Sequence, residues 1–358
     1  MRRDLLAFDA DAFIAWGRAA VGHADRFHRA AYRHLVATGR FAPQAVPEWR
    51  EADAAAPGVL ARYAALADEA QALPVVAQIV AGSAEHGPTT KLALRTDDGR
   101  RIESVLIPMA GGGHHTVCVS SQVGCRMGCG FCHTATMGLV RQLRPHEIVA
   151  QVAAVRAHTG IAPRNVVFMG MGEPLDNPEA VAAAVRVLSD VGGFAIGRRH
   201  ITVSTVGRID GLRRWRQLGL EGVNVAVSLT AADDGLRSEL MPINRAMPLA
   251  ELKAALAEVP LSRSGRILVA VVVIPGITDA PAQVDQLIAW CRGLPVLVNL
   301  IPFNPIPSRP WRAPDDAEVA AVRARLDAAG IPVRRRTTKG DQVMAACGQL
   351  GEDPDQAA

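Results

Sequence analysis

Three closely spaced cysteines, Cys125, Cys129 and Cys132, give this sequence its clearest capacity for chemistry. They form a C-x3-C-x2-C pattern in a glycine-rich loop, and glycine allows a backbone to wrap tightly around a bound group. A structural zinc site normally has four ligands in two pairs; no second pair follows, although His133 adjoins Cys132 and could in principle bind a metal. A [4Fe-4S] cluster held by three thiolates explains the spacing better, and it leaves one iron open to a substrate or cofactor.

The overall composition favours a globular enzyme in a reducing compartment. The chain has 358 residues, of which 49% are hydrophobic and 21% charged. Its six cysteines are too few and too unevenly placed for a disulfide scaffold, which favours metal or redox chemistry. Acidic residues at Asp4, Asp9 and Asp11 interrupt the segment where a signal peptide would be apolar. We therefore expect a cytoplasmic protein with no membrane partner.

The charge distribution is compatible with a nucleic-acid partner. The net charge is +4, and positive residues cluster in three runs, Gly197 to His200, Arg213 to Gln217 and Arg334 to Asp341. The first two runs are as readily explained by solvated helix faces and ends as by phosphate contacts. The third lies closest to a cysteine, and we favour it as a phosphate contact.

The residue patterns predict four segments. Residues 1–75 show helical spacing, with Phe27, Ala30, Ala31, His34 and Leu35 on one stripe, and predict a small helical domain. Residues 76–113 predict a β-hairpin with its turn at Asp98 and Gly99, followed by a glycine linker at 111–113. Residues 114–336 predict the main domain, and residues 337–358 a C-terminal loop and tail.

In the main domain, short runs rich in valine and isoleucine alternate with longer amphipathic segments. The expected strands are Val117–Ser120, Asn165–Met169, His200–Thr205, Val223–Leu229, Ile267–Ile274, Val296–Ile301 and Val333–Arg336. The expected helices are Arg144–His158, Pro178–Asp190, Ile209–Leu218, Leu249–Glu258, Ala282–Arg292 and Asp316–Ala328. This alternation predicts an α/β fold, a partial (β/α)6 barrel with its helices outside.

Polar and glycine-rich loops follow the carboxyl ends of five predicted strands. They are the thiol loop, Gly170 to Pro174, Ser204 to Gly207, Ser228 to Thr230, and Pro302 to Pro305. Each loop alone could be an ordinary turn. Because all five belong to the same end of the predicted barrel, we expect them to form one site.

The thiol pattern, with Phe131 before its last cysteine, resembles the radical S-adenosylmethionine superfamily. The flanking blocks "CVSSQVGC", "VVFMGMGEPLDN", "ITVSTVG", "LRSELMPINRAMPL", "VNLIPFNP" and "RTTKGDQVMAACGQL" resemble the RlmN/Cfr family, from about Thr90 to the C-terminus. The resemblance implies a [4Fe-4S] cluster on the three cysteines and two S-adenosylmethionine molecules per turnover. It also implies methylation of adenine C2 in 23S ribosomal RNA, with transfer RNA as a second candidate substrate.

The resemblance assigns catalytic roles to three further residues. Cys347 matches the cysteine that carries the methyl group, and Cys118 the thiol that releases the product through a transient disulfide. Glu103 matches the proton acceptor, although its position alone predicts a solvated strand residue. Cys291 lies on an apolar helix face and is predicted to belong to the core.

The resemblance also implies a set of contacts to S-adenosylmethionine. Gly172 and Glu173 match the positions that bind its amino end, and the other matching positions are Ser204, Ser228, Leu229, Thr230 and Asn304. The sequence departs from the family pattern at Thr230, where histidine is usual, at Ala135, where glycine is usual, and at His133, where a small residue is usual.

The expected partners are ribosomal RNA, transfer RNA and an external electron donor, and the expected state is a monomer. The helical segment 1–75 resembles the small RNA-contacting domain of the family only loosely. Two other functions stay open. One keeps the radical chemistry with another acceptor, such as adenine C8 or a molecule other than RNA; the other is a non-catalytic RNA-binding protein with a structural cluster or zinc site.

Overall fold

The computed structural model describes residues 4–81, 87–109, 111–263, 265–336, 344 and 346–351. Most of the predicted tail segment 337–358, and the end of the basic run at 337–341, lie outside these residues. The division into the segments 1–75, 76–113, 114–336 and 337–358 stays a prediction.

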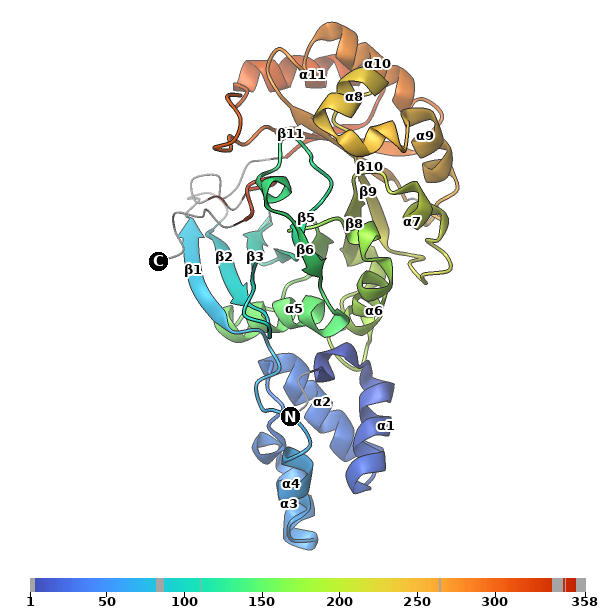
Figure 1. Ribbon diagram of the computed structural model, residues 1–358. Helices are drawn as coiled ribbons and strands as arrows, with labels where there is room; N and C mark the ends of the chain where they lie inside the picture. The colour runs from blue at the N-terminus through green and yellow to red at the C-terminus, as the bar shows by residue number, and fades with distance from the viewer. Residues whose placement is uncertain are drawn as a thin grey trace.

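A single curved sheet forms the body of the protein (Figure 1). Its strands are, in spatial order, β1 (Val75–Ala81), β2 (Thr89–Arg95), β3 (Arg101–Pro108), β4 (His115–Cys118), β7 (Asn165–Phe168), β8 (Ile201–Thr205), β9 (Asn224–Ser228), β10 (Ile267–Val273), β11 (Val296–Pro302) and β12 (Val333–Arg335). Neighbours from β4 to β12 pair in parallel, and β1 to β4 pair antiparallel. Within the described residues, β1 and β12 are the two edges, so the barrel is partial as predicted.

The helices form an arc around the parallel strands (Figure 1). They are α5 (Pro145–Thr159), α6 (Pro178–Ser189), α7 (Ile209–Arg213), α8 (Asp234–Leu240), α9 (Leu249–Ala257), α10 (Pro281–Cys291) and α11 (Asp316–Ala328). Local sequence signals determine where several helices begin. Asp315 and Glu318 form a capping box at the start of α11, and a proline stands at the first position of α5, α6 and α10. No helix in the described part of the chain is long and apolar enough to cross a membrane.

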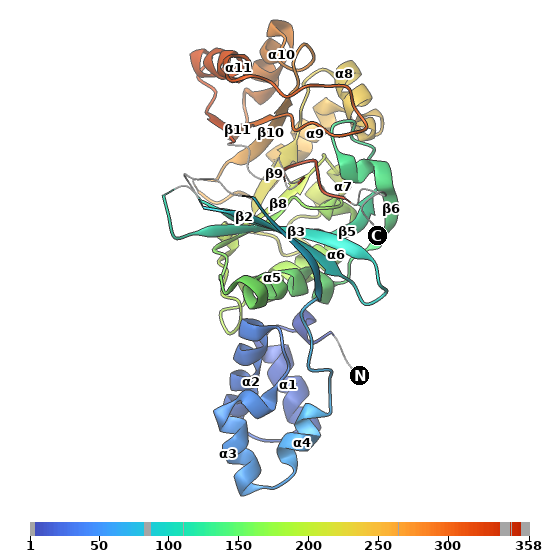
Figure 2. The same cartoon turned by 90° about the vertical axis from the view of Figure 1, so that its left-hand side faces the viewer.

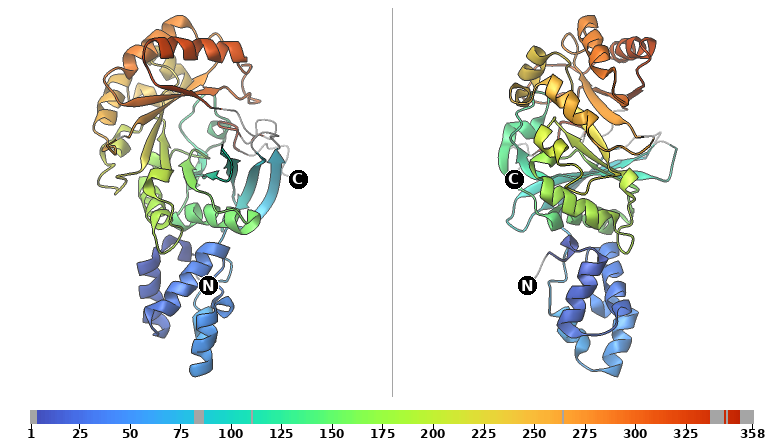
Figure 3. Two further views of the ribbon diagram at one scale, coloured as in Figure 1. Left: turned by 180° about the vertical axis from the view of Figure 1, so that it is seen from behind. Right: turned by 90° about the vertical axis from the view of Figure 1, so that its right-hand side faces the viewer.

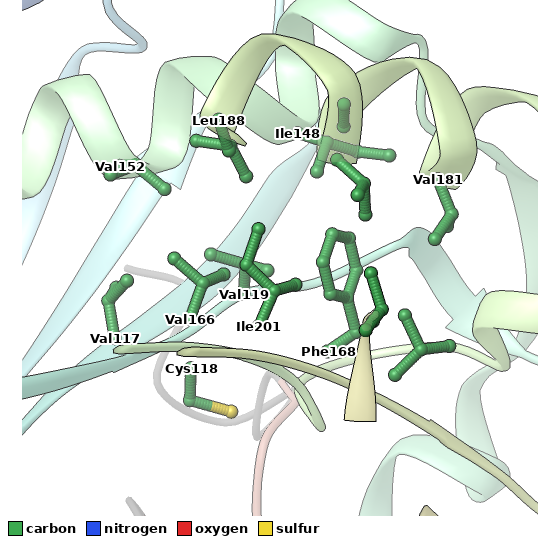
Figure 4. Close-up of a cluster of buried hydrophobic side chains, with 14 of the residues drawn as sticks. Val117, Cys118, Val119, Ile148, Val152, Val166, Phe168, Val181, Leu188 and Ile201 are labelled. Carbon is green, nitrogen blue, oxygen red and sulfur yellow. The ribbon is translucent and has the colours of Figure 1, made fainter. Parts of the chain in front are cut away.

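The two faces of the parallel strands differ in chemistry. Figure 4 shows Val117, Val166 and Ile201 pointing from the strands toward the helices, where Val152 of α5 and Leu188 of α6 lie. Cys118 points to the opposite side, toward the barrel interior, since successive residues of a strand face opposite ways. The apolar face of the strands thus packs against the helices, and the other face, which carries Cys118, points into the barrel.

A helical lobe lies on the outer side of α5 and α6, away from the strands (Figures 2 and 3). It consists of α1 (Ala10–Val21), α2 (Asp25–Thr38), α3 (Pro47–Ala55) and α4 (Val59–Ala64). Its core includes the stacked pair Trp49 and Tyr63, and α2 contacts α5, whose middle is buried all round. Of the predicted stripe of α2, Ala31 and Leu35 are buried, and Phe27 and Ala30 pack partly buried against the core; His28, Tyr32 and Val36 are also buried on this helix.

Several elements differ from the sequence expectation. The predicted linker at 111–113 is a turn that joins β3 directly to β4, so the hairpin is part of the barrel sheet. A small second sheet, β5 (Gln122–Cys125) with β6 (Gly138–Gln142), was not predicted, and neither were β1 and α8. The helix expected over Ile209–Leu218 ends at Arg213.

Candidate active site

All five predicted loops meet in one cavity at the carboxyl ends of the parallel strands, which we call the mouth cavity. Its lining includes Cys125, Cys129, Cys132, Gly170, Gly172, Glu173, Ser204, Ser228, Thr230, Phe303, Asn304, Arg336 and Cys347. The structure therefore brings together three predicted cluster ligands, most of the predicted cofactor contacts and one predicted catalytic thiol. Leu229 does not line the cavity: its side chain is buried in the core and its N–H donates to Ala270.

The thiol loop is held between β5 and the short helix η3 (His133–Met137). Burial raises the pKa of Cys125 to about 12 and also raises the pKa values of Cys129 and Cys132. Neighbouring thiols add to this rise for Cys125 and Cys129. Thiolates in such a dry, crowded place require a cationic metal centre to balance their charge.

The three cysteines provide the donor set of a cluster rather than the four ligands of a structural zinc ion. A [4Fe-4S] cluster instead distributes its thiolates over different irons. His133 is not among the lining residues of the mouth cavity; its ring lies beside Gly351.

The wall opposite the thiols carries a buried carboxylate. Glu173 accepts hydrogen bonds from the N–H groups of Leu175 (2.9 Å) and Val206 (2.8 Å), and burial raises its pKa to about 7. A ligand ammonium would restore the charged form of this carboxylate. The neighbouring position 172 requires glycine, because its φ is +101° and a Cβ there would lie 2.6 Å from Gln122 Cβ.

The surroundings of the Thr230 side chain indicate that the mouth cavity suits a polar ligand. Its Oγ1 is buried and has no hydrogen-bond partner in the described structure, and the residue is strained at φ +58°. A buried hydroxyl without a partner is costly, and a ligand in this cavity would satisfy it. With the thiols and Glu173, this fits S-adenosylmethionine bound beside a cluster.

Arg237 is a structural residue of this site that the sequence did not single out. Its side chain is fully buried, and its guanidinium donates to the carbonyls of Val206, Ser228 and Leu229 and to Asn244. Burial lowers its pKa to about 10. It ties the loops after β8 and β9 together, since one rigid guanidinium binds both.

A second cavity, which we call the lumen cavity, lies inside the barrel and contains both predicted catalytic thiols. Cys118, on β4, and Cys347 line it together, and Cys347 also lines the mouth cavity. Burial, and then the neighbouring Cys347, raise the pKa of Cys118 to about 12, while Arg336 opposes the rise. All six cysteines are free thiols, and Cys291 is buried on α10 as expected.

The segment around Cys347 is fixed by contacts from several elements. Asn304 donates to the carbonyl of Cys347 (3.0 Å), and the N–H of His133 donates to the carbonyl of Gly348 (2.6 Å). Gln349 donates to the carbonyl of Pro305 (3.0 Å). Cys347 is therefore held where the mouth and lumen cavities meet.

Glu103 corrects one sequence expectation. Its position on β3 suggested a solvated residue, yet its side chain is 2% exposed and pairs with Lys91 of β2. The reason is that the C-terminal segment covers this part of the sheet: Glu103 accepts a hydrogen bond from the N–H of Gly351. Glu103 lines neither the mouth cavity nor the lumen cavity.

A partial barrel with three thiols at its mouth is the architecture of radical S-adenosylmethionine enzymes. The family model described as the Radical SAM superfamily matches residues 119–288. The crystal structure of a radical SAM methyltransferase from Sphaerobacter thermophilus has a TM-score of 0.81 and 36% sequence identity to this chain. The match covers 98% of this chain and 99% of that chain, so the helical lobe belongs to the shared architecture.

Curated relatives define the family more closely. The dual-specificity RNA methyltransferase RlmN of Syntrophobacter fumaroxidans is 46% identical over 265 residues, covering 73% of this chain and 76% of that protein. The probable dual-specificity RNA methyltransferase RlmN 1 of Protochlamydia amoebophila is 43% identical over 265 residues, covering 74% of each. This chain belongs to the RlmN family of radical SAM methyltransferases. Its cofactors are accordingly a [4Fe-4S] cluster and S-adenosylmethionine.

Proposed function

We propose that this chain methylates carbon C2 of an adenine in 23S ribosomal RNA and, as a second substrate, in transfer RNA. The observation that carries the proposal is the pair of thiols, Cys118 and Cys347, in one cavity that adjoins the three-cysteine loop. Adenine C2 is an electron-poor carbon, so simple transfer of a methyl cation to it cannot work. A thiol that carries the methyl group and a second thiol that releases the product meet this difficulty.

When bound, the cluster and S-adenosylmethionine supply the methyl group and the radical that activates it. Cys347 holds the methyl group as a thioether and presents it to the ring carbon. Cys118 then attacks the sulfur of Cys347: the disulfide forms as the carbon–sulfur bond breaks, and the electron pair of that bond passes to the transferred carbon, which takes up a proton to become the methyl group of the product. Glu103, which lines neither cavity, accepts the proton of the ring carbon after the segment around Gly351 moves away from it. An external electron donor reduces the disulfide before the next turnover.

The mouth cavity holds the cofactors in this proposal. Cys125, Cys129 and Cys132 bind the cluster, and Gly172 with Glu173 receives the ammonium of S-adenosylmethionine. The other proposed contacts to S-adenosylmethionine are Ser204, Ser228, Thr230 and Asn304. Leu229 holds the backbone between Ser228 and Thr230. Threonine at position 230 offers a hydroxyl where histidine is usual.

RNA is the acceptor because the matched relatives are named RNA methyltransferases. Positive residues at the end of β12, Arg334 and Arg336, lie close to the Cys347 segment and would hold phosphates. The target base must leave its stack to reach the thiols, as in other enzymes that act on a base. The helical lobe within 1–75 is the proposed accessory RNA contact.

Mass spectrometry of nucleosides from cells with and without the protein tests the function. We expect 2-methyladenosine in both ribosomal and transfer RNA when the protein is present, and none with Cys347→Ala. Cys291→Ala serves as the matched control and should retain the product. Appearance of 8-methyladenosine would show that the methylated carbon is C8 and not C2. Unchanged nucleosides, with no reductive cleavage of S-adenosylmethionine, would contradict the proposal and favour a non-catalytic RNA-binding protein.

A further inference from the structure

The lumen cavity has room for a ligand beside the thiols of Cys118 and Cys347. Its volume is about 520 Å³, which lies within the range of small-molecule sites. It meets the mouth cavity at a boundary whose residues line both cavities: the apolar Met169, Leu268, Ile301 and Pro302, together with Asn299, Asn304, Arg336 and Cys347. A ligand inside the lumen would therefore contact the thiols from the side opposite the cofactor loops.

The inner row of residues at the amino-terminal ends of the strands keeps this cavity open. Thr116 of β4 lies beside Asn165 of β7, and Thr202 of β8 lies beside Asn224 of β9. In closed barrels of this class the inner layers are filled by bulky branched side chains. Here the four polar side chains lie in two successive layers and interrupt an apolar lining that includes Val167 and Leu268, so bulky branched side chains do not fill the lumen.

The cavity carries positive charge and no carboxylate. Its described lining includes Arg199, His200, Arg334, Arg335 and Arg336 but no aspartate or glutamate. Arg335 is paired with Asp316, which lies outside the lining. Arg199, Arg334 and Arg336 have no acidic partner among the described residues. Arg199 and Arg334 are solvent-exposed, so they mark the rim through which an anionic ligand would enter.

One carboxamide in the lumen is available for recognition. Asn165 bonds to Thr116 and His200, Asn224 donates to the carbonyl of Arg199, and Asn304 donates to Cys347. The side chain of Asn299, by contrast, has no hydrogen-bond partner within the described residues. A free carboxamide offers a donor beside an acceptor, which matches the amino group and adjacent ring nitrogen of adenine.

We propose that the lumen cavity binds the target adenosine, with Asn299 pairing with the amino edge of adenine and the rim residues Arg199 and Arg334 holding the adjacent phosphates. This proposal rests on the proposed function and identifies where that function receives its substrate. The nucleotide enters from the amino-terminal side of the strands, while S-adenosylmethionine occupies their carboxyl side. Cys118 and Cys347 then lie between the two ligands.

The first experiment uses RNA in which the target adenine is replaced by purine, which lacks the amino group. The wild-type enzyme should prefer adenine RNA by roughly 10-fold to 100-fold in kcat/KM, the discrimination expected of one paired base edge. Asn299→Ala should lose this preference mainly by becoming slower on adenine RNA. Equal losses on both RNAs would mean that Asn299 is merely structural and would overturn its assigned contact.

The second experiment measures RNA affinity against salt concentration for the full-length holoenzyme. Arg199→Ala and Arg334→Ala should each weaken binding and reduce the salt slope by about 1, as expected for one lost phosphate contact. Arg213→Ala is the matched control, because Arg213 is exposed and basic but does not line the lumen. Unchanged binding in both rim variants would overturn the proposed rim contacts.

Methylation of Cys347, read by peptide mass, separates the two proposals. If the variants methylate Cys347 normally but lose RNA affinity or base discrimination, the lumen site is supported. If wild-type enzyme methylates RNA and every lumen variant behaves like wild type, the lumen site is wrong while the function stands. If wild-type enzyme methylates no RNA, the proposed function itself fails, and the lumen site as a site for adenosine fails with it.

Discussion

Lys91 and Glu103 form an ion pair inside the protein, with Nζ and Oε1 3.1 Å apart and side chains only 7% and 2% exposed. The pair also binds both flanks of the segment that contains Cys347. Lys91 donates to the carbonyl of Met344 (3.1 Å), and Glu103 accepts from the N–H of Gly351 (3.0 Å). Because Cys347 lies between these two anchors, the ion pair positions it over the barrel.

Breaking this pair should be costly. Lys91→Met leaves a buried carboxylate without its cation, and we expect the free energy of unfolding in urea to fall by about 3–5 kcal/mol. The exposed pair Arg18 with Asp25 is the control, and Arg18→Ala should cost less than about 1 kcal/mol. Equal, small losses in both variants would show that the buried pair does not hold the segment.

Glu103→Gln tests the proposed proton acceptor. Glutamine keeps the volume and can still accept the hydrogen bond from Gly351, but it cannot take up a proton. Single-turnover assays should show RNA captured on Cys347 and released at least ~100-fold more slowly than in wild type. The control is the unfolding curve of the same variant, which separates lost chemistry from lost structure. Release at the wild-type rate would remove Glu103 from the mechanism.

Cys118→Ala should stop the reaction after covalent capture. Without the releasing thiol, RNA should stay attached to Cys347 and migrate with the protein on a denaturing gel. Cys291→Ala removes an equally buried thiol from α10 and should give free product. Free product from Cys118→Ala at the wild-type rate would contradict the role of Cys118.

Gly348→Ala tests whether the position of Cys347 matters. At φ +83° a Cβ on this residue would lie 2.9 Å from the carbonyl oxygen of Phe131, so the segment must move. We expect methylation of Cys347 to fall at least ~10-fold, by the loss of near-attack geometry. Gly293→Ala is the control: it places alanine at a similar φ, +84°, where no atom lies within 4 Å of the new Cβ, and it should leave methylation of Cys347 unchanged. Normal methylation in Gly348→Ala would show that the segment tolerates displacement.

Much of the site could be predicted because it depends on local patterns. The thiol spacing and the loops that follow predicted strands need only the rule that parallel strands end on one side of a barrel. The bounds expected for α11, Asp316–Ala328, are those observed, since Asp315 and Glu318 cap the helix locally.

Long-range contacts account for what the sequence did not reveal. Lys91, Glu103 and Arg237 are charged residues, which by type alone belong on the surface. They are buried because segments distant in the chain cover them, as Gly351 covers Glu103. Asn299 gained significance only when the inner faces of several strands formed one cavity, and the same cavity favours the phosphate contact that the sequence had left open for the run containing Arg199.

In the proposed reaction, Cys347 carries the methyl group, and this methyl group loses one of its hydrogens before transfer. S-adenosylmethionine with a fully deuterated methyl group, supplied to the anaerobically reconstituted enzyme with unmodified ribosomal RNA, tests this by nucleoside mass spectrometry. We expect 2-methyladenosine that retains two of the three deuterons. Retention of all three would mean direct methyl transfer to the base, and would rule out a methyl carrier that is activated by hydrogen loss.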